Sequence, residues 1–158
     1  MEFQVRKATK NDMPSVLKLI NELAVYEREP DAVEVTVADL ERDGFGDQPL
    51  FNCFVAQAED KIVGMALFYN RYSTWKGKTI HLEDLIVNED YRGKGIGMQL
   101  YKKVMQFALE ENIKRVEWVV LDWNTPAVNF YKNTGASVFS EWDTVQFDQD
   151  SIKKFLNP

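Results

Sequence analysis

Residues 80–97 read IHLEDLIVNEDYRGKGIG, and we expect the rest of the fold to be arranged around this stretch. Its first half is rich in branched apolar residues and predicts a β-strand over residues 80–87. Its second half spaces glycines at positions 93, 95 and 97 and continues into an amphipathic helix. The first backbone N–H groups of a helix have no partner within the helix, and the helix dipole adds partial positive charge there. The sequence therefore predicts an anion-binding corner made by a strand, a glycine loop and a helix N-terminus.

The composition is typical of a globular protein of one domain. A chain of 158 residues can bury a core of its own, and 45% hydrophobic and 13% aromatic residues are usual for folded proteins. No repeat, low-complexity tract or linker interrupts the chain, so we expect a single domain over residues 1–158. The net charge of −6 argues against a nucleic-acid partner, because phosphate binding needs a basic surface, and it is compatible with a cationic substrate.

Cys53 is the one cysteine, which excludes an intramolecular disulfide and indicates a reducing compartment. No histidine or charge cluster lies near it in sequence, so we expect a small buried core residue. The N-terminus lacks the apolar core of a signal peptide, and no stretch approaches the ~20 apolar residues of a membrane span. A cytoplasmic protein with no membrane partner is expected.

Apolar periodicity and turn residues predict the elements on either side of the corner. Before it we expect a strand at residues 3–7, a helix with apolar positions 16, 19, 20 and 23, a short helix from Thr36 to about residue 43, and a central hairpin of strands 51–58 and 61–72. After it we expect a helix to about residue 112, a strand at 116–121, a helix with Thr125 as N-cap and Pro126 at its first position, short strands at 136–140 and 144–147, and a last helical turn. This order predicts an α/β fold in which a mixed sheet carries helices on both faces.

The glycine loop does not match the two common nucleotide-binding motifs. The P-loop pattern GxxxxGK[ST] is absent. A Rossmann GxGxxG motif would lie early in a βαβ unit and be followed by an acidic residue about 20 positions later, whereas this loop comes late and opens with Arg92. Taken alone, the loop is compatible with either an anion site or a plain turn.

Residues 91–97, YRGKGIG, resemble the Q/R-x-x-G-x-G/A loop of the GNAT N-acetyltransferases, which holds the pyrophosphate of acetyl-CoA. Further stretches are similar to the diamine acetyltransferases, the group of spermidine/spermine N1-acetyltransferase and thialysine N-acetyltransferase, and the similarity covers nearly the whole chain in order. These stretches are LED at 82–84, DGFG at 43–46, WN at 123–124, NFYK at 129–132 and GA at 135–136. The resemblance implies a GNAT-type α/β (α+β) domain with a mixed, mostly antiparallel sheet that is split near Glu83.

By this resemblance the co-substrate is acetyl-CoA. Its pyrophosphate would bind to Arg92 and the N–H groups that follow, and its pantetheine arm would lie along strand 85–87 in the cleft where this strand diverges from strand 116–121. A backbone N–H group of strand 85–87 could stabilise the oxyanion of the tetrahedral intermediate. The residues implied in acetyl-CoA binding are Leu85, Ile86, Val87, Arg92, Gly93, Lys94, Gly95, Ile96, Gly97, Met98, Asn124, Pro126, Ala127 and Tyr131.

Two residues are expected to move protons. The amine substrate arrives as an alkylammonium ion with a pKa of ~10.4, and it must lose a proton before it attacks. Glu83 is our candidate to accept this proton through water and to anchor the cation. Asp84 faces the opposite side of a regular strand and is expected to be structural, unless a bulge intervenes. Tyr131 resembles the family's general acid, which protonates the departing CoA thiolate. The alternatives are a solvated Glu83 and a Tyr131 that only packs in the core.

His81, the only histidine, lies two residues before Glu83 on the same strand face. Related enzymes carry an aromatic residue here, so a packing or hydrogen-bonding position is expected in preference to a catalytic one. No cluster of His, Cys and Asp has the spacing of metal ligands, and no metal is expected.

For the amine acceptor, acidic groups would neutralise an ammonium and tryptophan would offer a cation–π face. Polyamine-specific relatives carry Asp two positions before the tryptophan that corresponds to Trp75, whereas this chain has Ser73. A long polyamine would therefore lose one counter-charge, so a shorter or lysine-like amine is favoured. The substrate residues implied by the resemblance are Tyr26, Glu27, Trp75, Glu83, Glu117, Trp118 and Glu141.

The function expected is therefore N-acetylation of a small cationic amine, such as a thialysine-like amine, a diamine or a polyamine, by direct attack in a ternary complex. Related enzymes are homodimers, and the apolar C-terminal strands (Val138, Phe139, Val145 and Phe147) could pair across such an interface. The alternatives are a different acceptor, namely a protein N-terminus, a protein lysine or an amino sugar, and a module that binds acyl-CoA without turnover.

Overall fold

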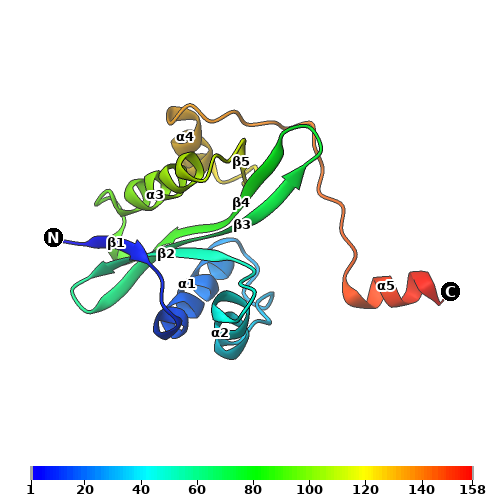
Figure 1. Cartoon of the computed structure of the whole chain (residues 1–158), viewed down its shortest axis with the longest axis horizontal. Helices are drawn as coiled ribbons and strands as arrows, with labels where there is room; N and C mark the ends of the chain where they lie inside the picture. The colour runs from blue at the N-terminus through cyan, green and yellow to red at the C-terminus, as the bar shows by residue number, and fades with distance from the viewer. Residues whose placement is uncertain (1, 158) are drawn as a thin grey trace. The chain divides into compact units, whose positions relative to one another are not determined.

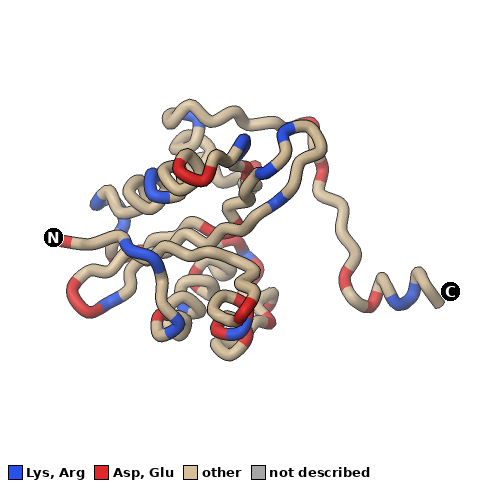
Figure 2. The backbone as a smooth tube through the Cα atoms, viewed as in Figure 1, with Lys and Arg blue, Asp and Glu red and all other residues tan. Residues whose placement is uncertain are grey.

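The computed structural model describes residues 2–157, which form two compact units that divide between Val119 and Val120. The first unit contains a five-stranded sheet and the helices that cover it, and the second contains two helices joined by an irregular segment (Figure 1). Acidic and basic residues are interspersed over the backbone of the first unit (Figure 2).

The sheet has the strand order β1-β2-β3-β4-β5. Its strands are β1 (Gln4–Lys7), β2 (Asn52–Ala58), β3 (Lys61–Ser73), β4 (Gly77–Val87) and β5 (Val116–Glu117). The first four strands pair antiparallel with their neighbours, and only β4 and β5 pair in parallel. The prediction of a mixed, mostly antiparallel sheet is therefore confirmed.

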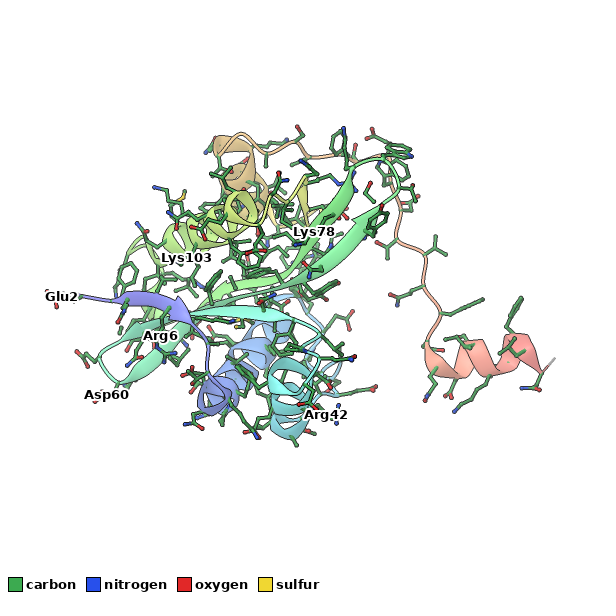
Figure 3. All side chains as sticks on the ribbon, in the orientation of Figure 1. Glu2, Arg6, Arg42, Asp60, Lys78 and Lys103 are labelled. Carbon is green, nitrogen blue, oxygen red and sulfur yellow. The ribbon has the colours of Figure 1, made fainter. Side chains whose placement is uncertain are left out.

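Helices cover both faces of this sheet. The helices α1 (Met13–Tyr26) and α2 (Val37–Phe45) lie on one face, and α3 (Ile96–Glu110) lies on the other (Figure 1). Both faces of the hairpin are consequently buried over residues 53–56 of β2 and 63–68 of β3, as its apolar composition predicts. Side chains fill the layers between the sheet and the helices; Figure 3 labels Arg6 on β1, Arg42 on α2 and Lys103 on α3.

Each side of the sheet has its own apolar core. On the α1 and α2 side, Val55, Met65 and Ile86 pack against the helices together with Cys53, which is buried as predicted. Burial raises the pKa of the Cys53 thiol to about 12, so it remains protonated and unreactive near neutral pH. On the α3 side, the rings of Phe54, Phe68 and Phe107 contact one another with centroids 5.0 to 6.4 Å apart.

The strand β5 is much shorter than the predicted strand 116–121. It pairs with β4 only at Ile80 with Val116 and at His81 with Glu117. Beyond these two pairs, the second half of β4 has a strand neighbour on one side only, namely β3. The split that the resemblance implies near Glu83 is thus present in the sheet of the first unit.

A β-bulge interrupts the pairing of β3 with β4. Leu67 lies opposite Asp84 while Phe68 lies opposite Leu82, so Glu83 is an extra residue in β4. An extra residue reverses the alternation of side chains after it. Glu83 and Asp84 therefore both face the α1 side of the sheet, whereas consecutive residues of a regular strand would face opposite sides.

Side chains that accept backbone hydrogen bonds lie before the first two helices. Before α1, a 3-10 turn (Lys10–Asp12) is closed by Asp12, which accepts a hydrogen bond of 2.7 Å from the backbone N–H of Thr9. At α2, Thr36 accepts from the N–H of Asp39, and the Asp39 carboxylate accepts from the N–H of Thr36 in return. The predicted start of the second helix at Thr36 is confirmed.

The second unit contains α4 (Thr125–Asn133) and α5 (Gln149–Leu156). Asn124, not Thr125, is the N-cap of α4, because its Oδ1 accepts from the N–H of Ala127. The strands predicted at residues 136–140 and 144–147 are absent, since this part of the unit is irregular. A strand needs a hydrogen-bonded partner, and none of the described residues pairs with this segment. No helix among residues 2–157 is long and apolar enough to span a membrane.

Candidate active site

The glycine loop leads from β4 into α3 with its backbone N–H groups uncapped. Gly93 and Gly95 have φ of +73° and +81°, a left-handed conformation that favours glycine. Gly95 is the N-cap of α3, and no side chain caps the helix there. A Cβ atom added at Gly93 or Gly95 would meet nothing within 4 Å, so the loop is open on its outer side. The strand, glycine loop and helix N-terminus of the predicted corner are present, and their open N–H groups are suited to an anion such as a pyrophosphate.

Arg92 lies at the start of this loop and is held by the surrounding chain. Its Nε donates to the carbonyl of Val87 at 2.9 Å, and its guanidinium lies 5.4 Å from the centre of the Tyr26 ring. Its Nη2 is 3.7 Å from Oε1 of Glu22. The guanidinium is thereby oriented beside the loop while it keeps N–H groups for an anion.

The C-terminal half of α1 is joined to this corner. Glu22 accepts hydrogen bonds of 2.9 Å from the side chain of Asn88 and from the N–H of Glu89. Tyr26, one turn further along α1, contacts Arg92, and the next residue is Glu27. The end of α1 is therefore fixed between the glycine loop and the bulge of β4.

Three carboxyl groups interact at the bulge. Burial, followed by the charges of Glu83 and Glu27, raises the pKa of Asp84 to about 7. Burial and the charge of Glu83 also raise the pKa of Glu27. Because three carboxylates repel one another in a half-buried place, an ammonium group bound among them would be stabilised and would lower these pKa values again. The cluster has the chemistry of a cation site.

The carboxylate of Glu83 is held by Tyr69 on the neighbouring strand. The Tyr69 hydroxyl donates to Glu83 Oε2 at 2.7 Å, and His81 Nε2 lies 3.7 Å from the same oxygen. Burial, with the hydrogen bond to Glu83 as the second cause, raises the pKa of Tyr69 to about 12. The Tyr69 and His81 rings are 5.4 Å apart, so His81 both packs and makes polar contacts, as expected.

Of the residues predicted to bind the amine, Glu27 and Glu83 are brought together and Tyr26 lies beside them in α1. Glu117 lies in an ion pair with Arg71 at 2.8 Å and with Arg115 at 3.0 Å, so its charge is already neutralised. Trp118 packs edge-on against Tyr101. Trp75 lies in the turn before β4 and is 81% exposed.

The remaining predicted residues belong to the second unit. Asn124, Pro126 and Ala127 form the first turn of α4, and Tyr131 follows on the same helix with its ring 5.4 Å from that of Phe130. Glu141 lies in the irregular segment after α4. Within residues 2–157, no group of three His, Cys, Asp or Glu side chains is arranged to hold a metal ion.

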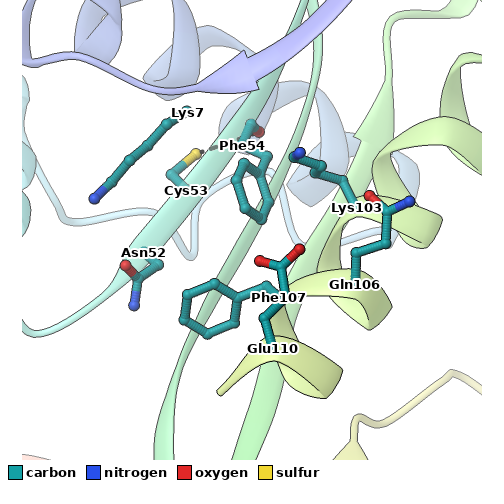
Figure 4. A pocket seen from close by; sticks show the side chains of 8 residues that line it. All are labelled: Lys7, Asn52, Cys53, Phe54, Lys103, Gln106, Phe107 and Glu110. Atoms are coloured by element: carbon teal, nitrogen blue, oxygen red, sulfur yellow. Dashed lines mark hydrogen bonds between the residues drawn. The ribbon is translucent and has the colours of Figure 1, made fainter.

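A cavity of about 230 Å³ lies elsewhere, between β2 and the C-terminal half of α3 (Figure 4). Phe54 and Phe107 form its apolar wall, and Lys7 and Lys103 contribute charged groups. None of the predicted site residues lines it. The remaining lining residues are Asn52, Cys53, Gln106 and Glu110.

Sequence reasoning expected a structural Asp84 unless a bulge intervened, and the bulge is present. It missed Tyr69 and Arg71 as neighbours of the acidic cluster. The bulge that turns Asp84 towards Glu83 leaves no pattern in the sequence. The one signal is an unusual pair of adjacent acidic residues, Glu83 and Asp84, within an otherwise apolar strand. Tyr69 and Arg71 could be identified only from the register of β3 with β4.

Comparison with known proteins gives consistent matches. The profile of the Acetyltransferase (GNAT) family matches residues 13–136. Spermidine/spermine N(1)-acetyltransferase-like protein 1 of Homo sapiens is 39% identical over 95% of this chain, which spans 23% of that protein. Thialysine N-epsilon-acetyltransferase of Bos taurus is 38% identical over 95% of both proteins. Among solved structures, an integron cassette protein from the mobile metagenome of V. cholerae has a TM-score of 0.81 and 26% identity over 100% of this chain and 99% of its own.

Proposed function

The chain belongs to the GNAT acetyltransferase family, and we propose that it transfers the acetyl group of acetyl-CoA to the primary amine of a small cationic acceptor. The observation that carries this proposal is the position of the end of α1. Through Tyr26 it contacts Arg92 of the anion-binding loop, and through Glu27 it joins the acidic cluster of Glu83 and Asp84. An anionic donor and a cationic acceptor would thus bind side by side.

The donor would be held by the corner of β4 and α3. A pyrophosphate would accept hydrogen bonds from Arg92 and from the uncapped N–H groups of Gly95, Ile96, Gly97 and Met98. The guanidinium and the positive end of the α3 dipole would also attract its negative charge. The half of β4 that lacks a partner on its β5 side offers main-chain groups along Leu85, Ile86 and Val87 for an amide-containing arm. Gly93 and Lys94 complete the loop, and Asn124, Pro126 and Ala127 are assigned to the same ligand by family resemblance.

The acceptor would enter the acidic cluster as an ammonium and lose a proton there. Glu83 takes this proton, either directly or through water, and the free amine nitrogen attacks the thioester carbonyl. A C–N bond forms and the C–S bond breaks, and the departing thiolate takes a proton from the Tyr131 hydroxyl. The assignment of Tyr131 rests on its place in the family motif.

The acceptor we favour is lysine-like. Relatives named thialysine N-epsilon-acetyltransferase are 32% to 38% identical over nearly the whole chain. The ion pair of Glu117 with Arg71 leaves fewer free carboxylates for a long polyamine than the sequence alone predicts, and Ser73 supplies no charge. Tyr26, Trp75, Trp118 and Glu141 remain the candidates for selectivity.

We further propose that both units make up one acetyltransferase domain, because the family profile runs from residue 13 to residue 136 and crosses the boundary between them. We propose a homodimer, because the exposed apolar residues of the C-terminal segment need a covering partner. A cytoplasmic location is consistent with the single buried cysteine.

The experiment is a thiol-release assay with acetyl-CoA and a panel of thialysine, lysine, spermidine, putrescine and small diamines. We expect turnover with at least one amine and the highest kcat/KM for a lysine-like one. Tyr131→Phe should keep the affinity for acetyl-CoA and lower kcat by about 10²–10⁴-fold, as loss of a general acid does. Binding of acetyl-CoA without turnover of any amine would favour a non-catalytic module, and turnover of peptides or amino sugars alone would favour the other acceptors.

A further inference from the structure

The two polar contacts that the described residues make with the Glu83 carboxylate converge on one oxygen. The Tyr69 hydroxyl donates to Oε2 at 2.7 Å, and His81 Nε2 lies 3.7 Å from the same atom. Tyr69 and His81 are directly opposite each other on β3 and β4, and their rings are inclined by only 30°. The two rings lie side by side, and the Tyr69 hydroxyl and His81 Nε2 both lie near Oε2 of Glu83.

The contact between Arg71 and His81 favours one tautomer of the imidazole ring. Arg71 Nη1 lies 3.4 Å from His81 Nδ1. A guanidinium has N–H donors and no acceptor, so a hydrogen bond between the two requires a lone pair on Nδ1. The proton of the neutral ring then lies on Nε2, on the side of Glu83.

Arg71 is itself held in place. It lies opposite Thr79 in the ladder, and the Thr79 hydroxyl donates to the Arg71 carbonyl at 2.8 Å. Glu117, the neighbour of His81 on β5, is 2.8 Å from Arg71 Nη1. A chain of contacts thus runs from β5 through Arg71 and His81 to Glu83.

We propose that Tyr69 and His81, with the His81 tautomer set by Arg71, are positioning residues that hold Glu83 by Oε2 and leave Oε1 to accept the proton of the acceptor ammonium. This inference rests on the proposed role of Glu83 as proton acceptor. The proton passes from the ammonium to Oε1, giving a neutral amine and a neutral Glu83 carboxyl group that later loses the proton to water. Tyr69 and His81 keep their own protons throughout.

The need for positioning follows from the environment of Glu83. Its side chain is half-exposed at a bulge, and the neighbouring carboxyl groups are Asp84 on β4 and Glu27 on α1. Repulsion from these two groups favours rotamers directed into water, whereas the Tyr69 hydroxyl and the Nε2 proton of His81 favour the inward rotamer. The charged groups that face His81 are Arg71 on β3, Glu83 on β4 and Glu117 on β5.

The tautomer can be measured without any turnover. His81 is the only histidine, so the imidazole signals of ¹⁵N-histidine-labelled protein need no assignment. At a pH where the ring is neutral, we expect a protonated Nε2 and an unprotonated Nδ1. Arg71→Met should yield a mixture of the two tautomers. A predominant Nδ1–H tautomer in the unmodified protein would overturn the proposal.

The role of Tyr69 is tested by Tyr69→Phe, with Tyr72→Phe as a matched control. Tyr72 lies three residues along the same strand and is 77% exposed. Removing the Tyr69 hydroxyl should lower kcat about 10- to 100-fold with little change in KM for acetyl-CoA. It should also move the acidic limb of the pH–rate profile to higher pH, because a carboxylate that loses a hydrogen-bond donor is protonated more readily. Unchanged kcat and an unchanged acidic limb would contradict the role of Tyr69.

Two substitutions of His81 separate positioning from packing. Glutamine can place an amide N–H near the position of Nε2, whereas phenylalanine keeps a ring and loses both nitrogens. We expect His81→Gln to retain most of kcat and His81→Phe to lose it at a similar melting temperature. Equal effects of both substitutions would contradict the proposal for His81.

Glu83→Gln separates the positioning proposal from the proposed function. If Glu83→Gln is inactive while Tyr69→Phe and His81→Phe remain active, the positioning proposal fails and the proposed function stands. If Glu83→Gln is fully active, the assignment of Glu83 as proton acceptor fails.

Discussion

Glu83 and Asp84, consecutive residues of β4, have their carboxyl groups on the same side of the sheet. Asp84 lies opposite Leu67, whose side chain is in the core beneath α1, and Glu83 accepts a hydrogen bond from Tyr69, two residues along β3 from Leu67. In a regular strand they would face opposite sides. The bulge thus places on one face negative charge that a regular strand would divide between the two faces of the sheet.

Asp84→Asn should make the protein more stable at neutral and alkaline pH. The pKa of Asp84 is about 7 in the folded protein and near ~3.9 in an unfolded chain, so the folded state binds the extra proton between these values. Stability contributed by this group is full below pH ~4 and falls as the pH rises to about 7. The difference in pKa corresponds to about 4 kcal/mol at most, and we expect a gain of roughly 1–3 kcal/mol at pH 8 after the neighbours relax.

Urea unfolding at pH 5 and pH 8 measures this effect. Asp60→Asn, in the exposed turn between β2 and β3, is the control and should leave the pH dependence of the unmodified protein unchanged. If Asp84→Asn shows the same loss of stability between pH 5 and pH 8 as the unmodified protein, Asp84 is not the titrating group.

Asp12→Ala should destabilise the fold at neutral pH and remove a step at acidic pH. Asp12 makes two hydrogen bonds with Arg6, of 2.8 and 2.9 Å, and its side chain is only 10% exposed. The hydrogen bond from Arg6 is the main cause that lowers its pKa to about 2. The group therefore contributes stability above pH ~4 that is lost as the pH falls towards 2.

We expect Asp12→Ala to lower the free energy of unfolding by about 2–3 kcal/mol at pH 7 and by less than 1 kcal/mol at pH 2. Asp150→Ala removes an exposed carboxylate that lies 3.7 Å from Lys153, and it should change stability little at either pH. A loss for Asp12→Ala that is equal at both values of pH would show that packing, and not the ion pair, is responsible.

Much of the first unit could be predicted because local patterns and tertiary contacts agree there. The hairpin of β2 and β3, the cap at Thr36 and the glycine loop before α3 all follow from short stretches of sequence. The strand expected at residues 116–121 is shortened to Val116–Glu117 because pairing with β4 stops at His81. Apolar composition indicates that a segment can form a strand, but a neighbour must be available to pair with it.

The candidate site could be predicted where its residues form a short motif or where the family resemblance names them, as it does for Tyr26 and Glu27. Arg92 and the glycines are read directly from residues 91–97, whereas the contact of Tyr69 with Glu83 joins residues 14 positions apart across a ladder. The register that brings them together includes a bulge, and no residue type marks its position. The role of Arg71 was hidden for the same reason, since its partners lie on β4 and β5.

Gly95→Ala should impair both folding and acetyl-CoA binding, whereas Gly97→Ala should not destabilise the fold. Gly95 has φ of +81°, where an alanine costs about 1–2 kcal/mol. Gly97 lies within α3, and an added Cβ would meet Val87 Cγ2 at 3.6 Å, an ordinary contact. Alanine is also favoured over glycine in a helix by up to about 1 kcal/mol.

Chemical unfolding of both variants tests this difference, and calorimetric titration of Gly95→Ala with CoA should give at least a fivefold weaker affinity. If Gly95→Ala is as stable as the unmodified protein, the left-handed N-cap of α3 is not needed in solution.

Phe147→Asp should convert a dimer into a monomer. In the segment after α4, Phe139, Val145 and Phe147 are 67%, 94% and 62% exposed, and this segment has the apolar alternation of a strand without pairing with any described residue. Such a segment can pair with the same segment of a second copy, and burying these side chains would supply the driving force.

Sedimentation velocity should give a dimer for the unmodified protein. For Phe147→Asp the dissociation constant should be at least tenfold higher, which corresponds to about 1.4 kcal/mol of binding free energy. Leu109→Asp, on α3 and 83% exposed, is the control and should remain dimeric. A monomeric unmodified protein at micromolar concentrations would rule out this role for the segment.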